Sequence, residues 1–275
     1  MSLSGLVVGA AGGVGSEVVR QMLTTGYRVT GTVLNEDEAA TVRKQTAGVE
    51  QILVLDLANA DNVVETLRAS LDEVNAVVVC AAISPYGPLE IAPLAGFRRT
   101  MEINTVSGLA VYQATMPLLR ASKGRLVLIS SFAGKVSLPF IGHYVASKHA
   151  LEGLGDVMRY EAKSFGVDVI LIEPGSIKTP MVSNQLNTLG RDRQALSAED
   201  ARLYGEMYDN FSRLAGQGWE TMMMPSVVAE VVLDALHAPN PQARYQVGDD
   251  SKYLCDVARK TDSEIDAIID GFWGG

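Results

Sequence analysis

The fold is decided near the amino terminus by residues 6–15, which read LVVGAAGGVG. The apolar residues Leu6 to Val8 predict a short buried strand, and a glycine-rich turn follows them without a break. A turn without side chains lets backbone N–H groups approach a pyrophosphate, which the positive end of the next helix dipole then holds. We therefore predict a strand, a phosphate-binding turn and a helix from Ser16 to Thr24, with a glycine-rich turn that binds no ligand as the alternative.

Further apolar runs follow along the chain, and helical segments separate them. Strands that are apolar along their whole length are typical of a parallel sheet that helices cover on both faces. Long helical patterns at 97–119 and 144–165 fit this arrangement. We expect an α/β, Rossmann-type doubly wound fold with a parallel sheet of about seven strands. The expected strands are 6–8, 29–33, 52–55, 76–79, 126–129, 169–172 and 245–247.

The pattern changes at 181–225, where polar linkers and glycines surround large apolar side chains. A long segment without a strand suggests a flap over a binding site. Because no repeat, charge run or low-complexity linker divides the chain, we expect a single domain over 1–275, with 181–225 as its flap. The large side chains of the flap are Met181, Tyr204, Met207, Tyr208, Phe211, Trp219 and Met222 to Met224.

The composition limits the partners of the chain. Its formal net charge is −9, from 23 basic and 32 acidic residues. Such a chain has no basic face to neutralise phosphates, so we expect a small molecule or further copies of the chain as partners, and no nucleic acid. Cys80 and Cys255 are too few for a disulfide framework, which favours the reducing cytoplasm. We also expect no secretion leader and no membrane span, because no apolar stretch approaches the required length.

A tyrosine and a lysine at helical spacing offer acid/base chemistry. Tyr144 and Lys148 open a helical pattern, and their spacing puts both side chains on one helix face about a turn apart. A phenol has an ordinary pKa of about 10, too high for a base near neutrality, and a nearby ammonium lowers that pKa because it stabilises the phenolate. The alternative is a surface pair without a chemical role.

Other polar residues lie near the edge of the sheet where open α/β folds bind their ligands. Ser130 and Ser131 follow one predicted strand, and the run from Glu173 to Thr179 includes the end of another. Asn104 lies inside a helical pattern, although an amide is a mediocre helix former. Each has a structural alternative. Ser131 could be a turn residue at a strand end, the run from Glu173 to Thr179 could be a plain turn, and Asn104 could mark a local kink or a solvent contact.

In this order and spacing the motifs strongly resemble those of the short-chain dehydrogenase/reductase family, from Leu3 to about Thr179. The glycine turn matches the family's GxxxGxG, and the separation of 13 between Ser131 and Tyr144 (144 minus 131) matches its catalytic spacing. The resemblance implies a catalytic tetrad of Asn104, Ser131, Tyr144 and Lys148, and no metal. It also implies cofactor contacts from Gly9, Gly13, Val14, Gly15, Asp56, Leu57, Ala81, Tyr144, Lys148, Pro174, Ile177 and Thr179.

Two places depart from the family pattern. Val8 stands where a threonine is usual, and Val79, Cys80, Ala81 and Ala82 stand where the family has Asn-Asn-Ala-Gly. The small residues keep room for a cofactor, whereas the missing asparagines change the hydrogen bonding of this loop.

The resemblance implies an NAD(P)-dependent enzyme that transfers a hydride between its cofactor and a secondary alcohol or ketone. Tyr144 would give or take the hydroxyl proton, and Ser131 would hydrogen-bond the same oxygen. Lys148 would lower the pKa of Tyr144 and bind the ribose hydroxyls, while Asn104 would hold a water that relays the proton. Family members commonly associate through their two long helices, so we expect a homodimer or homotetramer.

Two other functions are compatible with the fold. A sugar-nucleotide epimerase or dehydratase also uses a tyrosine and a lysine, but it needs a larger carboxyl-terminal domain than the roughly 90 residues after Thr179 supply. A non-catalytic dinucleotide-sensing regulator would have no need for the complete tetrad.

Two acids favour NAD(H) as the cofactor. Glu36 and Asp37 lie about 20 residues past the glycine turn, where a carboxylate can bind the ribose hydroxyls and repel a 2′-phosphate. Neither family signature is complete, because Val33 holds the usual acidic position and Leu34 holds the position that is basic in many NADP users. The alternatives are NADP(H) as cofactor, and acids that only stabilise the start of a helix.

The side chains of the flap favour a largely apolar substrate, like those of hydroxysteroid- or retinol-type relatives. Methionines and aromatic residues adapt to an apolar ligand and exclude water. A phosphate or carboxylate would need a dedicated cationic clamp, which the flap does not offer. The alternative is that these side chains pack against the body of the protein or against a second copy.

Overall fold

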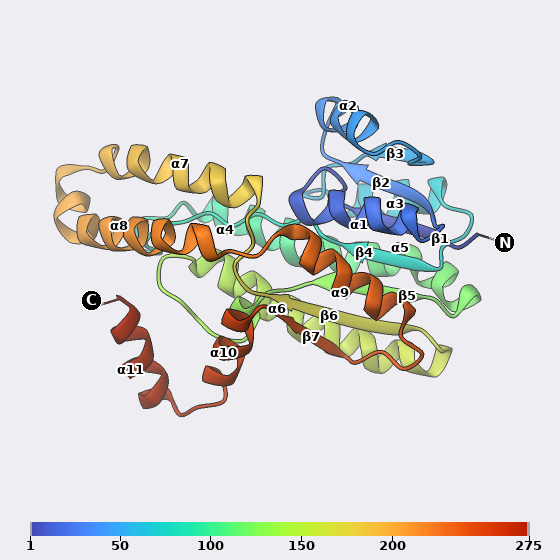
Figure 1. The fold of residues 1–275 in the computed structure, drawn as a ribbon. Coiled ribbons are helices and arrows are strands. Elements are labelled where there is room, and N and C mark those ends of the chain that lie inside the picture. The colour runs from blue at the N-terminus through green and yellow to red at the C-terminus, as the bar shows by residue number, and fades with distance from the viewer. Residues whose placement is uncertain (1, 274–275) are drawn as a thin grey trace.

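The computed structural model describes residues 2–273, and a single parallel sheet forms its centre (Figure 1). The strand order is β3-β2-β1-β4-β5-β6-β7, and each neighbouring pair is parallel. This confirms the predicted doubly wound α/β fold with seven strands, each within two residues of its expected bounds. The strands are β1 Ser4–Val8, β2 Arg28–Val33, β3 Gln51–Val54, β4 Ala76–Val79, β5 Arg125–Ile129, β6 Asp168–Pro174 and β7 Arg244–Val247.

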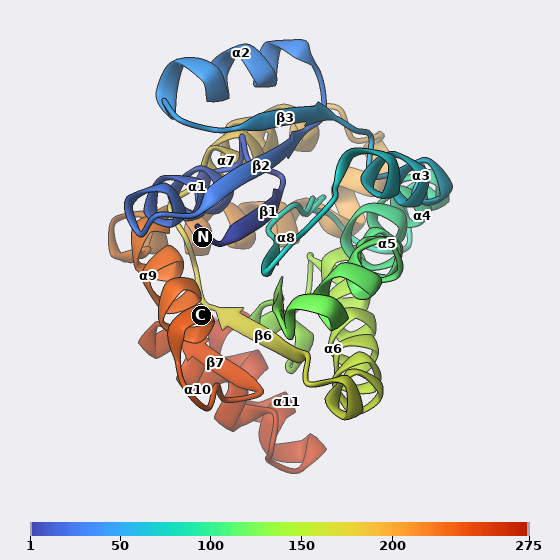
Figure 2. The same cartoon turned by 90° about the vertical axis from the view of Figure 1, so that its right-hand side faces the viewer.

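Helices cover both faces of the sheet, as Figure 2 shows from its end. On one face lie α1 (Gly13–Thr24) and α9 (Pro225–His237), and on the other lie α3 (Ala60–Ser70), α5 (Ser107–Ser122) and α6 (Gly142–Ala162). The remaining helices are α2 Glu36–Gln45, α4 Leu94–Met101, α7 Pro180–Gln194, α8 Ala198–Gly218, α10 Asp249–Val257 and α11 Asp262–Trp273. Short π- or 3-10 helices are η1 Glu102–Val106, η2 Phe132–Gly134, η3 Lys163–Phe165 and η4 Trp219–Thr221.

The two-sided burial explains the continuous apolar strands. In β1, Val7 belongs to the core beneath α1 and α9, whereas Leu6 and Val8 belong to the core on the opposite face. A strand buried on both faces therefore favours apolar residues at successive positions, and burying each such side chain contributes about 1.5–3 kcal/mol.

Two helical segments differ from their predicted form. The helix expected at 97–119 is interrupted by the π-helix η1, and the helix expected to open at Tyr144 begins two residues earlier, at Gly142. A π-turn inside a helix often marks a functional site. This π-turn contains Asn104, so the helix is locally irregular at this residue, as the structural alternative for Asn104 stated.

The segment predicted as a flap contains most of α7, all of α8 and η4 rather than loops. These helices lie together at one end of the molecule, with α11 below them in the view of Figure 1. Within residues 2–273, no helix is both long enough and apolar enough to cross a membrane.

Candidate active site

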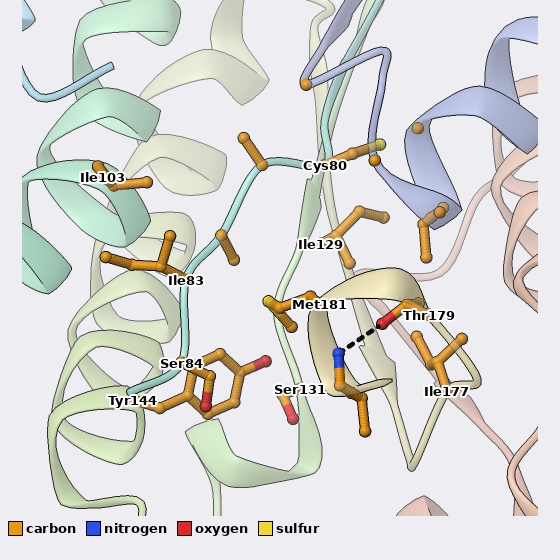
Figure 3. Close-up of a pocket in the computed structure, with 18 of the residues that line it drawn as sticks. Cys80, Ile83, Ser84, Ile103, Ile129, Ser131, Tyr144, Ile177, Thr179 and Met181 are labelled. Carbon is orange, nitrogen blue, oxygen red and sulfur yellow. Dashed lines mark hydrogen bonds between the residues drawn. The ribbon is translucent and has the colours of Figure 1, made fainter. Parts of the chain in front are cut away.

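A cavity of about 410 Å³ lies at the carboxyl ends of the strands. The glycine turn after β1 and the segment after β4 both line it, at the point where the strand order reverses from β1 to β4. Open α/β sheets bind their ligands at this switch point. Figure 3 shows side chains from the segment after β4, from β5, from α6 and from the β6–α7 segment around it.

The glycine turn has a geometry that other residues could not adopt. Gly9 has a φ of +84°, and a Cβ atom there would lie 2.8 Å from the Cβ of Ala81. A Cβ on Gly15 would lie 2.1 Å from the carbonyl oxygen of Gly9. Gly12, the N-cap of α1, has no side chain that could accept from the first N–H groups of the helix. The turn therefore fits a pyrophosphate at the positive end of α1, as a dinucleotide requires.

Tyr144 and Ser131 face each other in the cavity (Figure 3). Ser131 is the N-cap of η2, and its Oγ accepts from the backbone N–H of Ala133 at 3.1 Å. Burial raises the pKa of Tyr144 to about 12, and the hydrogen bond with Ser131 opposes this shift. The phenol is therefore protonated at neutral pH, the form that can donate a proton to a carbonyl oxygen.

Lys148 lies one helical turn after Tyr144 and is 2% exposed. Its Nζ donates to the carbonyl oxygen of Ile129 at 2.7 Å and lies 5.5 Å from the centre of the Tyr144 ring. Burial lowers the pKa of Lys148 to about 8, while Glu152 and then Cys80 act in the opposite direction. The sequence predicts that Lys148 lowers the pKa of Tyr144; in this structure the pKa of the phenol is raised by burial, and Ser131 is the neighbour that opposes the shift.

Asn104 lies behind the cavity instead of lining it. Its Oδ1 accepts from the N–H of Ile83 at 2.8 Å, and its Nδ2 donates to the carbonyl oxygen of Ile83 at 2.8 Å and to Ser147 Oγ at 2.9 Å. Both amide hydrogens are thus used within the protein. This side chain fixes the segment after β4 against α6, and its amide nitrogen has no hydrogen left for the predicted water.

Every other residue of the implied tetrad and of the implied cofactor contacts lines this cavity, whereas Glu36 and Asp37, predicted at the ribose, do not. Several lining residues were not predicted, and some of them, such as Glu38, Ser84 and Tyr86, follow β2 or β4 at the same sheet edge. The rule that ligands bind at the carboxyl ends of parallel strands would have found these positions, but not the side chains that reach the cavity. The unpredicted polar and aromatic ones are Thr32, Glu38, Ser84, Tyr86, Arg99 and Phe132.

The acidic residue at the cavity is Glu38, not Glu36 or Asp37. Glu38 Oε2 accepts from the backbone N–H of Leu34 at 2.8 Å, whereas Glu36 pairs with Arg43 on the helix surface at 3.7 Å. Glu38 is the third residue after Asn35, which is the N-cap of α2. Its carboxylate therefore reaches back toward the end of β2.

Two of the large flap residues, Met181 and Met222, line the cavity, together with Val182. Most of the aromatic ones pack elsewhere. Phe211 stacks on Phe140 with ring centres 4.6 Å apart, and this pair continues to Trp273 of α11. These side chains therefore pack against the body of the protein, which is the alternative stated for the flap. They are Tyr204, Met207, Tyr208 and Phe211.

Comparison with known proteins agrees with this arrangement. The profile of the family described as short chain dehydrogenase matches residues 5–189. An NADPH-dependent 3-dehydrocapnine reductase of Ornithobacterium rhinotracheale is 29% identical over 88% of this chain and 87% of its own length. Mouse retinol dehydrogenase 16 is 31% identical over 90% and 80%. A short chain dehydrogenase from Burkholderia cenocepacia J2315, solved in complex with NADP, has the same fold with a TM-score of 0.74 at 19% identity, covering 98% of this chain and 97% of its own.

Proposed function

The chain belongs to the short-chain dehydrogenase family, and we propose that its alcohol or ketone substrate is largely apolar. It is a nicotinamide-dependent oxidoreductase that acts on an alcohol or a ketone. One observation carries the proposal: Tyr144 and Ser131 face each other in a cavity that a phosphate-binding turn lines at one side and apolar side chains at another.

Each side chain has a defined task in this reaction. The bound nicotinamide supplies or accepts the hydride. Tyr144 donates its proton to the carbonyl oxygen during reduction, and Ser131 hydrogen-bonds the same oxygen and holds it beside the phenol. Lys148, inside the same pocket, stabilises the phenolate that remains. Because the pKa of Tyr144 is raised, reduction suits neutral pH and oxidation should become faster as the pH rises.

The substrate end of the cavity is apolar. Its lining there includes Tyr86, Phe132, Ile141, Met181, Val182 and Met222. Glu38, Asp56, Arg99 and Lys148 are the charged residues among those that line the cavity, and Lys148 is occupied by the Ile129 carbonyl. Among the described lining residues, Arg99 is the other cation, so the cavity offers one guanidinium rather than a cluster of cations to a substrate phosphate or carboxylate.

A series of ketones of increasing length tests this substrate class. Burying one more methylene contributes about 0.8 kcal/mol, so kcat/KM should rise about fourfold per added carbon until the pocket is full. Steady-state oxidation of reduced cofactor measures the series. A flat or falling series, combined with efficient turnover of a sugar or keto acid, would contradict the proposal.

For the cofactor, we propose a preference for NAD(H) that depends on Glu38. Its carboxylate lies beside Leu34 at the end of β2, where it would repel a 2′-phosphate. Arg99, which also lines the cavity, and the NADPH-dependent relative named above support NADP(H) instead.

The variant Glu38→Gln should therefore lower the ratio of kcat/KM for NADH over NADPH by about tenfold, because a like-charge repulsion is lost. Glu36→Gln is the matched control, since Glu36 pairs with Arg43 away from the cavity. Equal ratios in the two variants, or a wild type that prefers NADPH, would contradict the preference.

We also propose that the chain acts as a single catalytic domain in the cytoplasm and as a homodimer or homotetramer. The exposed apolar side chains Val157, Tyr160 and Phe165 at the end of the α6 region support self-association. The segment after Thr179 forms the flap helices, α9, β7, α10 and α11. Cofactor-driven turnover would exclude a purely sensing role.

A further inference from the structure

A group of ion pairs around two buried carboxylates lies next to Lys148, one helical turn further along α6. Glu152 of α6 and Glu173 of β6 are 4% and 0% exposed, and two cations, Lys135 and Arg244, reach both carboxylates. These residues come from four parts of the chain: the turn after η2, α6, β6 and the edge strand β7. Burying charges is costly unless they are paired, so this arrangement requires an explanation beyond stability.

Arg244 is the centre of the group. Its Nε lies 3.0 Å from Glu152 Oε2 and 3.2 Å from Glu173 Oε1, and its Nη2 donates to Asp156 Oδ2 at 2.8 Å. Lys135 Nζ adds a contact of 3.4 Å to Glu152 Oε2. One guanidinium thus links two turns of α6 to the strand that leads into the Pro174 turn.

The same group touches both elements that carry the chemistry. Glu152 follows Lys148 by one helical turn on the same helix face. A Cβ atom on Gly134 would lie 2.8 Å from Glu152 Cγ and 3.1 Å from the carbonyl oxygen of Lys148. The short helix η2, which Ser131 caps, therefore rests on the turn of α6 formed by Lys148 and Glu152.

We propose that Glu152, held by Arg244 and Lys135, is a positioning residue that keeps the Lys148 ammonium charged and the Ser131 turn in place for proton transfer. This role rests on the proposed function of Lys148 and Tyr144. It goes beyond the tetrad, because Glu152 and Arg244 act through neighbours without lining the cavity.

The surroundings of Lys148 leave Glu152 as its main source of negative charge. Burial raises the pKa of both Cys80 and Tyr144 to about 12, so both are neutral at pH 7. Glu152 is the largest influence that opposes the lowered pKa of Lys148. The charged and titratable groups around this lysine are Tyr144 and Glu152 of α6, Cys80 after β4, Lys135 after η2, Glu173 of β6 and Arg244 of β7, with Asp156, Arg159 and Cys255 behind them.

The titration of Lys148 in the whole protein provides the direct test. With lysine labelled at 13Cε, NMR can follow this side chain, and Lys148→Met identifies its signal. In the wild type the signal should titrate near pH 8. Glu152→Gln keeps the size of the side chain but removes its charge, so Lys148 should lose its proton at a pH about one unit lower.

Turnover supplies the second readout. Glu152→Gln should lower kcat for ketone reduction about twofold at pH 7 and about tenfold at pH 9, because a pKa about one unit lower leaves less of Lys148 charged, and it should move the alkaline limb of the pH profile to lower pH. Glu152→Asp, which keeps the charge, should restore most of both. Arg125→Met is the control for the loss of an ion pair elsewhere in the sheet, because Arg125 pairs with Asp168 at 3.3 Å. It should lose stability without moving the Lys148 titration.

An unchanged Lys148 titration in folded Glu152→Gln would overturn the proposal even if turnover falls. If Lys148 titrates at a lower pH in Glu152→Gln but the wild type reduces no ketone, the role of Glu152 would be supported and the proposed function contradicted. If Glu152→Gln does not fold, Lys135→Gln takes its place, since that side chain is one-third exposed. Losing this cation should move the Lys148 titration to higher pH, and no movement would overturn the proposal.

Discussion

Replacing Tyr144 by phenylalanine is expected to reduce kcat by about 10²- to 10⁴-fold while cofactor affinity stays within about threefold of wild type. The substitution removes only the phenolic oxygen, which is the group that faces Ser131 and holds the proton. The ring keeps its packing beside Ala133, Ile141 and Val145, so the fold should be retained. Single-turnover reduction of a ketone and fluorescence titration with reduced cofactor measure the two quantities separately.

Tyr208→Phe is the matched control for this variant. Tyr208 is also buried, but it packs edge-on against Phe140 with ring centres 4.7 Å apart and does not line the cavity. It should keep turnover within about twofold, because it loses a hydroxyl away from the reacting atoms. If Tyr144→Phe retained activity within about tenfold of wild type, Tyr144 would not be the acid/base.

The sheet could be predicted because burial on two faces leaves a strong local pattern. Every position of a strand such as β4, from Ala76 to Val79, meets an apolar core, and such a run contrasts with the amphipathic helices on either side. The glycine turn could be predicted equally well, because the backbone at Gly9 and Gly15 leaves no room for a side chain.

Side-chain direction could not be predicted in the same way. Three acids begin α2, and only the turn of the helix brings Glu38, rather than Glu36 or Asp37, back to the end of β2. Asn104 matched a catalytic pattern, yet the partners that occupy its amide come from segments 21 and 43 residues away. Contacts of this range leave no periodic signal in a local window.

The flap illustrates the same limit. The sequence allowed two positions for its aromatic side chains, either covering the site or packed on the body of the protein, and it offered no means of choosing between them. The choice depends on Phe140, which has a φ of +74°, and on Trp273, whose carbonyl oxygen accepts from Asn210 Nδ2 at 3.4 Å across 63 residues. At the substrate end the flap supplies Met181 and Met222, as its composition indicated, while Tyr86 and Ile141 come from segments outside the flap.

Replacing Lys148 by methionine is expected to lower kcat by about 10²-fold and to weaken cofactor binding about tenfold, because one ammonium would serve both the phenolate and the ribose. Stability should respond differently. Burial lowers the pKa of Lys148 from 10.5 to about 8, so carrying its charge inside the fold costs on the order of 3 kcal/mol below pH 8, and this cost disappears as the pH rises toward 10.5.

Methionine carries no such cost, although the carbonyl of Ile129 loses its donor, which offsets about 1–3 kcal/mol. The melting temperature of Lys148→Met at pH 7 should therefore equal or exceed that of wild type while activity collapses. Differential scanning calorimetry and cofactor titration on the same preparation measure both. A variant that binds cofactor as tightly as wild type would remove the ribose role. If the activity of Lys148→Met falls only as much as its folded fraction falls, Lys148 has a structural role. A catalytic role requires an inactive protein that is at least as stable as wild type.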